Sequence, residues 1–434
     1  MPQSRRRFLA GTGVTAIAYK LAGSPPPLRP AAPNDQVGLG FIGVGIRGTQ
    51  LLCAFKNTAG VRIVAAADLY DGFLQNAKEV TQGSIATTKA YEEILSRRDV
   101  DAVVIATPDH WHRRMVLDAL SAGKHVYIEK PMTWSIPEGA EVMAAVRRSG
   151  RMLQVGSGAG STALAAKAKE LLKSGAIGKV SMVRMSNHRN NAEGAWVYPI
   201  PPDASPGTID WDRFHGPAPK RPFDPKIFFR WRCWWEYSGG VATDLYVHLL
   251  TALHEVMDVR GPLSAVSSGG IYRWNDGRTV PDVMSTVYEY APGWLADVYV
   301  NLGNSRHPHG TLIMGSEGTL AFQGFSRLVL YPEPVFSAVQ RYATGCWPEA
   351  LRKQYLESVA AEARPEPRKE QEIAVERGRS HQEQFVRSLR DGTPPIEDAV
   401  KGHYAAGAAH LANLAYRKGR RMNWNLETGK VRAG

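Results

Sequence analysis

The stretch Asp244-Leu-Tyr-Val-His248 places a carboxylate and an imidazole four residues apart, directly after a glycine pair and a group of tryptophans. On a regular helix this spacing puts both side chains on one face. A carboxylate there can orient the imidazole, which can accept and return a proton, or both groups can touch a ligand. The pair therefore indicates a proton-transfer site, although by itself it also fits a helix with two solvated or internally satisfied polar residues.

A further candidate for the same chemistry is Lys130, which lies in Glu129-Lys130-Pro131 after the apolar run 126–128. Oxidation of a secondary alcohol needs a group that takes the hydroxyl proton. It also needs a cationic or hydrogen-bond-donating group that stabilises the developing carbonyl oxygen. We expect His248 to act as general base and acid, with Lys130 and Asp244 as its partners.

The glycine-rich stretch Gly43-Val-Gly45-Ile46-Arg47-Gly48 fits the pattern G-x-G-x-x-G and stands between the apolar run 37–42 and a helical pattern. In that context the glycines permit a tight turn, close approach of a pyrophosphate, and close packing of helix on sheet. Asp68 follows 20 residues after Gly48 and can accept hydrogen bonds from the ribose hydroxyls of NAD. We predict NAD in preference to NADP, with Arg47 as the residue that could reverse the preference.

Other cofactor contacts are expected where parallel strands end, because ligands of open parallel sheets bind outside the carboxyl ends of the strands. Thr107, Pro108 and His112 have such a position and are predicted to line the nicotinamide side. His110 and His112 alternate, which suits chelation poorly, and the three cysteines are scattered, so no metal site is predicted. The predicted cofactor contacts are Gly43, Gly45, Ile46, Arg47, Gly48, Asp68, Thr107, Pro108, His112, Glu129 and Lys130.

Two domains must position these residues. Alternating strand and helix patterns predict a doubly wound parallel sheet of the Rossmann type over residues 36–157, with strands at 37–42, 61–67, 102–106, 126–128 and 152–155. Residues 158–425 are predicted to form an α+β domain with an open, largely antiparallel sheet, from strands at 180–188, 263–272, 283–290, 296–302 and 310–315. The amphipathic pattern at 399–419 is expected to pack back against one of the two domains. Residues 334–379 are poorly patterned.

Aromatic and basic residues gather just before the Asp244 stretch, in the segment 228–235. Such residues can stack on sugar rings and pair with carboxylates, or they can form a core between the domains, and both interpretations stay open. His188, Arg189 and Asn190 end a strand-like run and are weaker candidates for substrate contact. The predicted substrate contacts are His188, Arg189, Arg230, Trp231 and Arg232.

Several motifs together resemble the Gfo/Idh/MocA family, which includes glucose-fructose oxidoreductase and inositol dehydrogenase. They are GVGIRG, ATPDHWH, KHVYIEKP, a glycine pair followed by Asp244 and His248, GSEGTL and HQEQFVRSLRDGTPP, and they span roughly residues 37–425. The resemblance implies a nicotinamide cofactor, a sugar, polyol or related cyclic substrate, and a homo-oligomer through the sheet of the second domain. It matches Lys130 to the lysine of the E-K-P motif, and Asp244 and His248 to the Asp and His of the second-domain helix.

The N-terminal residues 1–35 read as an export signal followed by a proline-rich linker. Ser4-Arg5-Arg6-Arg7-Phe8-Leu9 and the short apolar run 14–21 resemble a twin-arginine signal, and the alternative is an unstructured basic N-terminus. Twin-arginine export would place the protein in the periplasm or outside the cell. No segment is long and apolar enough for a membrane helix. The net charge of +12 is dispersed and accompanies no nucleic-acid-binding motif, so neither membrane nor nucleic acid is an expected partner.

Export would constrain the mechanism, because a dissociable NAD would be lost where no soluble pool exists. A cofactor retained through the cycle can be regenerated by exchange with a second carbonyl compound. It can also serve a redox-neutral cycle, in which transient oxidation permits elimination of a glycosidic bond. The best-known glycosidases that resemble this family lack the Lys130-Pro131 motif, which favours net oxidoreduction here. A non-catalytic sugar- or NAD-binding protein is the third alternative, and the presence of Lys130, Asp244 and His248 argues against it.

Overall fold

The first six strands form one parallel sheet in a computed structural model that describes residues 36–306, 310–324, 327–334, 342–360, 368–375 and 378–434. Their order is β3-β2-β1-β4-β5-β6, so the chain reverses its direction across the sheet between β1 and β4. Such a reversal opens a crevice at the carboxyl ends of the strands. The strands are β1 (Val37–Ile42), β2 (Val61–Ala67), β3 (Ala86–Thr88), β4 (Ala102–Ile105), β5 (His125–Ile128) and β6 (Leu153–Val155). The predicted Rossmann-type sheet is confirmed, whereas the short β3 was missed.

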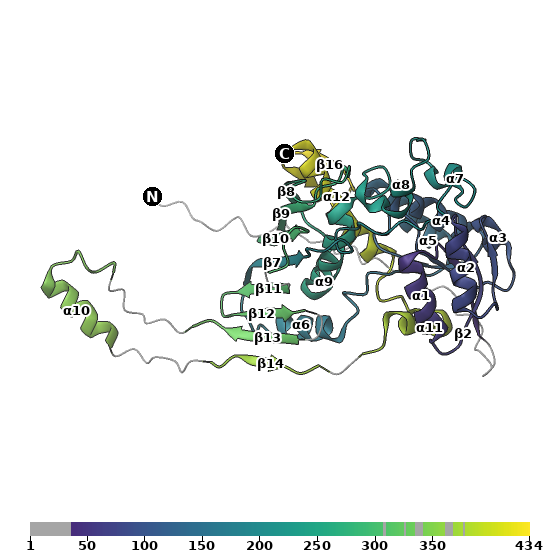
Figure 1. Ribbon diagram of the computed structural model, residues 1–434. Helices are drawn as coiled ribbons and strands as arrows, with labels where there is room; N and C mark the ends of the chain where they lie inside the picture. Colours follow the sequence, from purple (N-terminus) through teal and green to yellow (C-terminus); the bar gives the residue numbers. More distant parts are fainter. Residues whose placement is uncertain (1–35, 307–309, 325–326, 335–341, 361–367, 376–377) are drawn as a thin grey trace, which may run out of the picture.

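Helices cover both faces of this sheet (Figure 1). They are α1 (Ile46–Lys56), α2 (Asp71–Val80), α3 (Tyr91–Ser96), α4 (Asp109–Ser121) and α5 (Ile136–Ser149). One buried cluster joins the sheet to α3, α4 and α5, and another joins it to α1 and α2. Helix α11 (His381–Asp391), far along the chain, completes the second cluster with Phe385, which packs against Phe55 and Tyr127. A C-terminal helix is therefore part of the core of the first domain.

The second sheet has ten strands in the order β14-β13-β12-β11-β7-β10-β9-β8-β15-β16. Every neighbouring pair is antiparallel except β7 and β10, which run parallel, so the predicted largely antiparallel sheet is confirmed. Five of its strands were not predicted, and three of those contain only three residues each. The strands are β7 (Val180–His188), β8 (Ser264–Gly270), β9 (Val283–Tyr290), β10 (Trp294–Asn301), β11 (Gly310–Gly315), β12 (Gly318–Gln323), β13 (Arg327–Pro332), β14 (Gln371–Ile373), β15 (Met422–Trp424) and β16 (Val431–Ala433).

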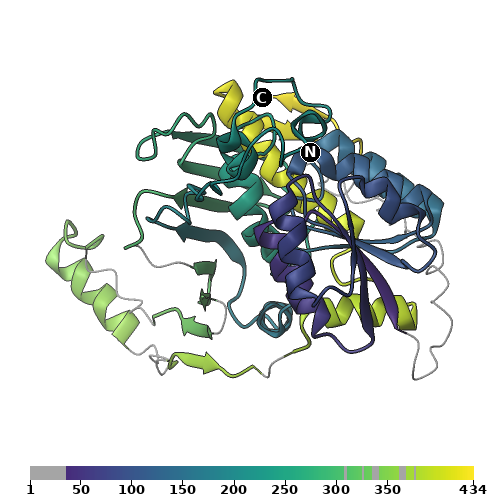
Figure 2. The same ribbon diagram turned by 45° about the vertical axis from the view of Figure 1, so that its right-hand side comes forward.

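Three helical segments lie between the second sheet and the first domain (Figure 2). They are α6 (Ala163–Lys173), the continuous pair η2 (Ala242–Tyr246) and α9 (Val247–Met257), and α12 (Ala399–Lys418). Helix α12 contacts α5 of the first domain as well as α9 and β8 of the second, so it joins both domains rather than packing against one. Alanine and glycine on several of its faces allow this close approach, as at Gly402, where an added Cβ would meet Val155 at 2.5 Å.

The long connection between β7 and η2 carries three short helices, α7 (Trp211–His215), α8 (Pro225–Phe229) and η1 (Trp231–Cys233). Another excursion, between β13 and β14, carries α10 (Glu349–Ala360) away from the rest of the molecule (Figure 1). The proposed export segment 1–35 lies outside the described residues. Within the described ranges, no helix has both the length and the apolar character needed to span a bilayer.

Candidate active site

The glycine turn joins β1 to α1 and is built without room for larger side chains. A Cβ at Gly43, which has a φ of 85°, would lie 2.8 Å from the backbone of Ala106, and one at Gly48 would lie 2.1 Å from the carbonyl oxygen of Gly43. Helix α1 begins with no side-chain cap and no acidic residue in its first turn. Its first N–H groups are therefore available to an anion, which fits the pyrophosphate of a dinucleotide.

Asp68 ends β2 beside this turn. Its Oδ2 accepts a hydrogen bond from the Val44 amide at 2.7 Å, its Oδ1 accepts one from the Tyr70 amide at 3.1 Å, and burial raises its pKa to about 6. Arg47 points elsewhere, because its Nε donates to Oε1 of Glu129 at 2.7 Å, and Glu129 follows β5 on the opposite side of β1. Nothing in this geometry directs Arg47 toward the ribose site, so the arrangement agrees with NAD.

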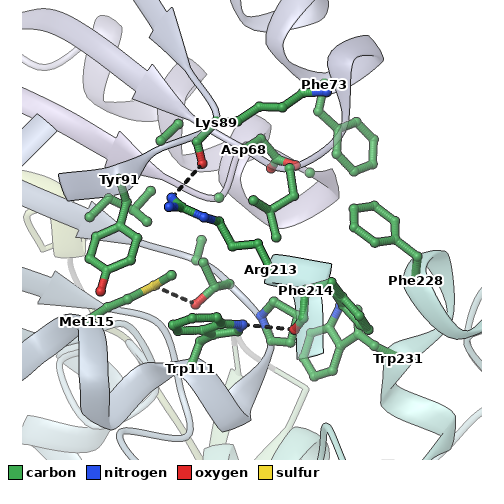
Figure 3. Close-up of a pocket in the computed structure, with 18 residues that line it drawn as sticks. Asp68, Phe73, Lys89, Tyr91, Trp111, Met115, Arg213, Phe214, Phe228 and Trp231 are labelled. Atoms are coloured by element: carbon green, nitrogen blue, oxygen red, sulfur yellow. Dashed lines mark hydrogen bonds between the residues drawn. The ribbon is translucent and has the colours of Figure 1, made fainter. Parts of the chain in front are cut away.

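A cleft of about 690 Å³, partly open to solvent, runs from the glycine turn past Asp68 (Figure 3). Thr107 and Pro108 line it, as predicted. Trp231 was predicted as a substrate contact and Phe228 lies in the segment 228–235 singled out above, but the other aromatic and basic residues of its wall were not predicted. The residues that line it without having been predicted as contacts include Phe73, Lys89, Tyr91, Trp111, Met115, Arg213, Phe214 and Phe228.

We call residues 203–229 the cover segment, because they lie across the β2 end of this cleft. The Ile209 backbone forms a β-bridge with Tyr70, Asp210 donates to the carbonyl oxygen of Leu69 at 2.9 Å, and the Asp71 amide donates to that of Thr208 at 3.1 Å. Phe229 then packs edge-on against Tyr70 and Phe73, with ring centroids 5.2 and 5.8 Å apart. The second domain therefore closes the outer side of the cleft.

Lys130, Asp244 and Arg232 meet at a nearly buried junction between the domains. The Nζ of Lys130 lies 2.7 Å from Oδ1 of Asp244, the Nε of Arg232 lies 3.0 Å from the same oxygen, and Trp196 Nε1 donates to Oδ2 at 3.1 Å. Burial opposes ionisation of Asp244, but the two cations outweigh it and hold the pKa of that carboxyl far below its usual range. Asp244 is therefore a fixed negative charge between two positive ones.

His248 lies one turn further along but is oriented by a different group. Its Nδ1 lies 3.2 Å from the carbonyl oxygen of Ser157, which can only accept, so Nδ1 carries the hydrogen and Nε2 the lone pair. Removal from solvent, reinforced by Lys130, lowers the pKa of His248 to about 3. The ring is consequently a neutral proton acceptor at Nε2, which has no hydrogen-bond partner within the described residues.

The regular helix face expected for Asp244 and His248 is not what the structure contains. Residues Ala242–Tyr246 form a π-helical turn, and the α-helix starts only at Val247. Such turns occur mostly as single-turn bulges and frequently at functional sites. The widened turn carries Asp244 toward Lys130, while the His248 ring faces Ser157, so the carboxylate does not orient the imidazole.

The loop that carries Ser157 is held by Glu397, which sequence reasoning did not single out. This buried carboxylate accepts hydrogen bonds from the Ser157 hydroxyl and from the amides of Gly158 and Gly160, the latter two at 3.3 and 3.1 Å. Burial raises its pKa. Glu397 thus fixes the position of the carbonyl that orients His248.

The remaining predicted residues have mixed positions. His112 is buried, with its ring nitrogens 2.6 and 2.9 Å from the carbonyl oxygens of Pro131 and Thr107, so it braces two loops and does not line the cleft. His188 is buried beside Tyr299. The Nε of Arg230 donates to the carbonyl oxygen of Tyr198 at 2.7 Å. Within segment 228–235, Phe228 and Trp231 line the cleft, whereas Cys233 and Trp234 are buried in the core of the second domain. Contact of this segment with a sugar stays a prediction.

Across the described ranges, no group of three or more His, Cys, Asp or Glu side chains is placed to hold an ion.

Two sequence profiles of one family match the chain. A profile described as "Oxidoreductase family, NAD-binding Rossmann fold" matches residues 37–157, and one described as "GFO/IDH/MocA C-terminal domain" matches residues 207–321. Together they cover more than half of the chain.

Curated relatives match a shorter stretch. A "Glycosyl hydrolase family 109 protein" of Shewanella pealeana is 30% identical over 173 residues, which is 34% of this chain and 38% of that protein. An "Alpha-N-acetylgalactosaminidase" of Shewanella oneidensis is 31% identical over 170 residues, 33% of this chain and 37% of that protein. The matched stretch is less than two fifths of the length of either relative.

Solved structures share the fold over nearly the whole chain at low identity. The WlbA dehydrogenase of Bordetella pertussis, in complex with NADH and UDP-GlcNAcA, has a TM-score of 0.66 at 16% identity and covers 91% of this chain and 100% of its own. The aldose-aldose oxidoreductase of Caulobacter crescentus has a TM-score of 0.62 at 19% identity, covering 89% and 99%. The chain belongs to the Gfo/Idh/MocA family, and its N-terminal domain is an NAD-binding Rossmann domain.

Proposed function

We propose that the protein is an exported oxidoreductase that transfers a hydride between a retained NAD and a hydroxyl-bearing carbon of a sugar, polyol or glycoside. The observation that carries this proposal is the Lys130–Asp244 ion pair at the junction between the NAD-binding domain and the second domain, with His248 one turn beyond Asp244 and near enough for Lys130 to help lower its pKa. Lys130 follows β5 of the first sheet, whereas Asp244 and His248 come from the second domain.

Each of the three side chains has a separate role in the proposed reaction. The substrate hydroxyl gives its proton to Nε2 of His248, which is neutral and accepting. The ammonium group of Lys130 donates a hydrogen bond to the developing carbonyl oxygen, and the ion pair with Asp244 holds that ammonium in place. A nicotinamide held at the glycine turn and Asp68 would supply the acceptor for the hydride of the carbinol carbon. In the reverse direction His248 returns the proton to the alkoxide oxygen.

Retention of the cofactor is supported by the cover segment. The cleft beside Asp68 is bounded by Arg213, Phe214, Phe228 and Trp231 of the second domain, so NAD bound there would be enclosed on two sides. A retained cofactor needs a second carbonyl compound to restore its oxidation state. The twin-arginine route, the periplasmic location and a homo-oligomer through the second sheet belong to the same proposal.

A second candidate is a redox-neutral glycosidase, favoured by the names of the curated relatives. In this cycle, oxidation of a ring hydroxyl to a ketone makes the neighbouring C–H acidic, and elimination then expels the aglycone and leaves a double bond. Water would add to that double bond, and return of the hydride to the ketone would restore the hydroxyl. Lys130 and His248 would serve both the oxidation and the proton abstraction.

One experiment separates the two. The purified full-length protein is examined for bound nicotinamide by absorbance and is then mixed with sugars, polyols and activated glycosides. Reduction or bleaching of the bound cofactor, with sugar oxidised in proportion, is the expected result. Aglycone released without net redox change would instead identify the glycosidase, and a protein that does neither refutes both.

A further inference from the structure

Arg232 lies at the same junction as Lys130 and Asp244, but only one of its nitrogens contacts Asp244. Its Nε lies 3.0 Å from Oδ1 of Asp244, the oxygen that Lys130 contacts at 2.7 Å. A guanidinium carries five N–H donors, and this contact uses one. Lys130 and Trp196 already bind both oxygens of Asp244, so positioning that carboxylate does not explain a complete guanidinium here.

The orientation of this guanidinium is fixed from two sides. Asp244 holds Nε, and the Trp231 ring lies beneath the group, with the central carbon 4.3 Å from the ring centroid. Within the described residues, Nη1 and Nη2 have no hydrogen-bond partner. Neither nitrogen is among the fully buried polar atoms without a hydrogen-bond partner, so solvent can reach both of them. Arg232 therefore presents a rigid pair of donors to a ligand.

The charges around the junction favour an anion. Asp244 neutralises only one of Lys130 and Arg232, and His248 is neutral. Two other carboxyls are nearby. Glu129 forms an ion pair with Arg47, so that pair adds no net charge. Asp109 is buried and accepts hydrogen bonds from Gly239 and Thr243, and its burial raises its pKa to about 7, so below that pH it adds little negative charge. The junction of Lys130, Arg232 and Asp244 therefore carries a surplus of positive charge.

We propose that the paired terminal nitrogens of Arg232 bind a carboxylate of the substrate, which is therefore a uronic acid or a glycoside of one. A planar carboxylate matches the two parallel donors of a guanidinium. Because Lys130 and Arg232 share one oxygen of Asp244, they reach neighbouring parts of a single sugar ring, with the reacting hydroxyl at Lys130 and the carboxylate at Arg232. This rests on the proposed function, since it names the class of sugar that the site takes.

The test is equilibrium binding by calorimetry to the full chain with NAD bound. Matched pairs are used, glucuronate with glucose, galacturonate with galactose, and mannuronate with mannose. At least one uronate should bind tenfold or more tightly than its neutral counterpart. Arg232→Lys should weaken that uronate about tenfold and leave the neutral sugar within about twofold. Arg184→Lys, on the exposed surface and paired with Asp297, is the matched control and should change neither.

Three outcomes would overturn the proposal. Equal affinity for the uronate and the neutral sugar in every pair would show that the site does not bind a carboxylate. This comparison needs only the wild-type protein, so it tests the proposal even if Arg232→Lys does not fold. If Arg232→Lys weakens binding of the uronate and of the neutral sugar equally, Arg232 only positions Asp244 and does not bind the carboxylate. Tighter binding of glucose 6-phosphate than of any uronate would point to a phosphate. The absorbance of bound nicotinamide is followed separately, so a uronate that binds selectively without being oxidised contradicts the proposed function alone.

Discussion

Lys130 and Asp244 form an ion pair with only 10% and 13% of their side chains exposed, which makes each group dependent on the other. Removing one partner of a buried pair leaves an uncompensated charge and costs about 3–5 kcal/mol in general. The loss of stability is expected to be smaller when Lys130 is removed, because Arg232 remains as a second cation beside the same oxygen of Asp244. Loss of Lys130 should therefore impair catalysis more than folding.

Replacing Lys130 with Ala is expected to lower the rate of nicotinamide reduction by about 10²- to 10³-fold while NAD stays bound, because the developing carbonyl oxygen loses its cationic donor. The measurement is single-turnover absorbance of the cofactor together with its content after gel filtration. Lys169→Ala, which breaks pairs with Glu255 and Asp258 elsewhere, is the control. Unchanged turnover in Lys130→Ala would remove the catalytic assignment of this residue.

At the level of elements, the active site combines loops at the carboxyl ends of the first sheet with one irregular helix. The glycine turn, the loop after β5 and the Ser157 loop come from the carboxyl ends of the first sheet, whereas the π-turn of η2 comes from the second domain. The cover segment adds a wall fastened by backbone hydrogen bonds and by aromatic rings. Loosening that wall should affect retention of the cofactor before it affects the chemistry.

Phe229→Ala is expected to speed NAD release, because the variant loses the ring contacts with Tyr70 and Phe73 that fasten the cover segment. Aromatic pairs contribute about 0.5–1.5 kcal/mol beyond area burial, so two lost contacts predict roughly a tenfold or larger rise in the dissociation rate. The rate is followed by the fluorescence of bound NADH during dilution. Phe322→Ala, in β12 of the second sheet, is the matched control, and equal release rates in both variants would argue against a retaining role for the cover segment.

For the whole molecule, the two domains share helices and a buried junction, so they should unfold together and respond together to pH. Burial lowers the pKa values of five histidines to about 3 or 4. They are His110, His125, His254, His403 and His410. In the unfolded chain these groups take up protons near pH 6.5. Asp68 and Asp109 act in the opposite direction, because burial raises their pKa values to about 6 and 7.

The free energy of unfolding should therefore fall as the pH drops from about 6.5 toward 4, since the unfolded state binds more protons than the folded state across that window. Each histidine can contribute up to about 1.4 kcal/mol per pH unit, and the two carboxyls offset part of the sum. Urea unfolding at pH 7 and pH 5 measures the difference. His254→Gln, which removes one such group beside Tyr290, should flatten the dependence, and an unaltered slope would contradict this account.

The sequence by itself determined the glycine turn, Asp68 and every strand of the first sheet except the short β3, because a βαβ unit is local: a buried apolar run, a turn that only glycine fits and a helix follow one another along the chain. It also predicted that Lys130, Asp244 and His248 act together, from the chemistry of their side chains and from the resemblance. Only the tertiary structure decided how they are held. The π-turn at Ala242–Tyr246 is local, but the helical spacing of Asp244 and His248 did not reveal it. The other three features join residues far apart in sequence: the Ser157 carbonyl that orients His248, the Glu397 carboxylate that holds Ser157, and the Ile209 contact with Tyr70. Such long-range contacts follow from packing of the two domains, which periodicity along the chain does not encode.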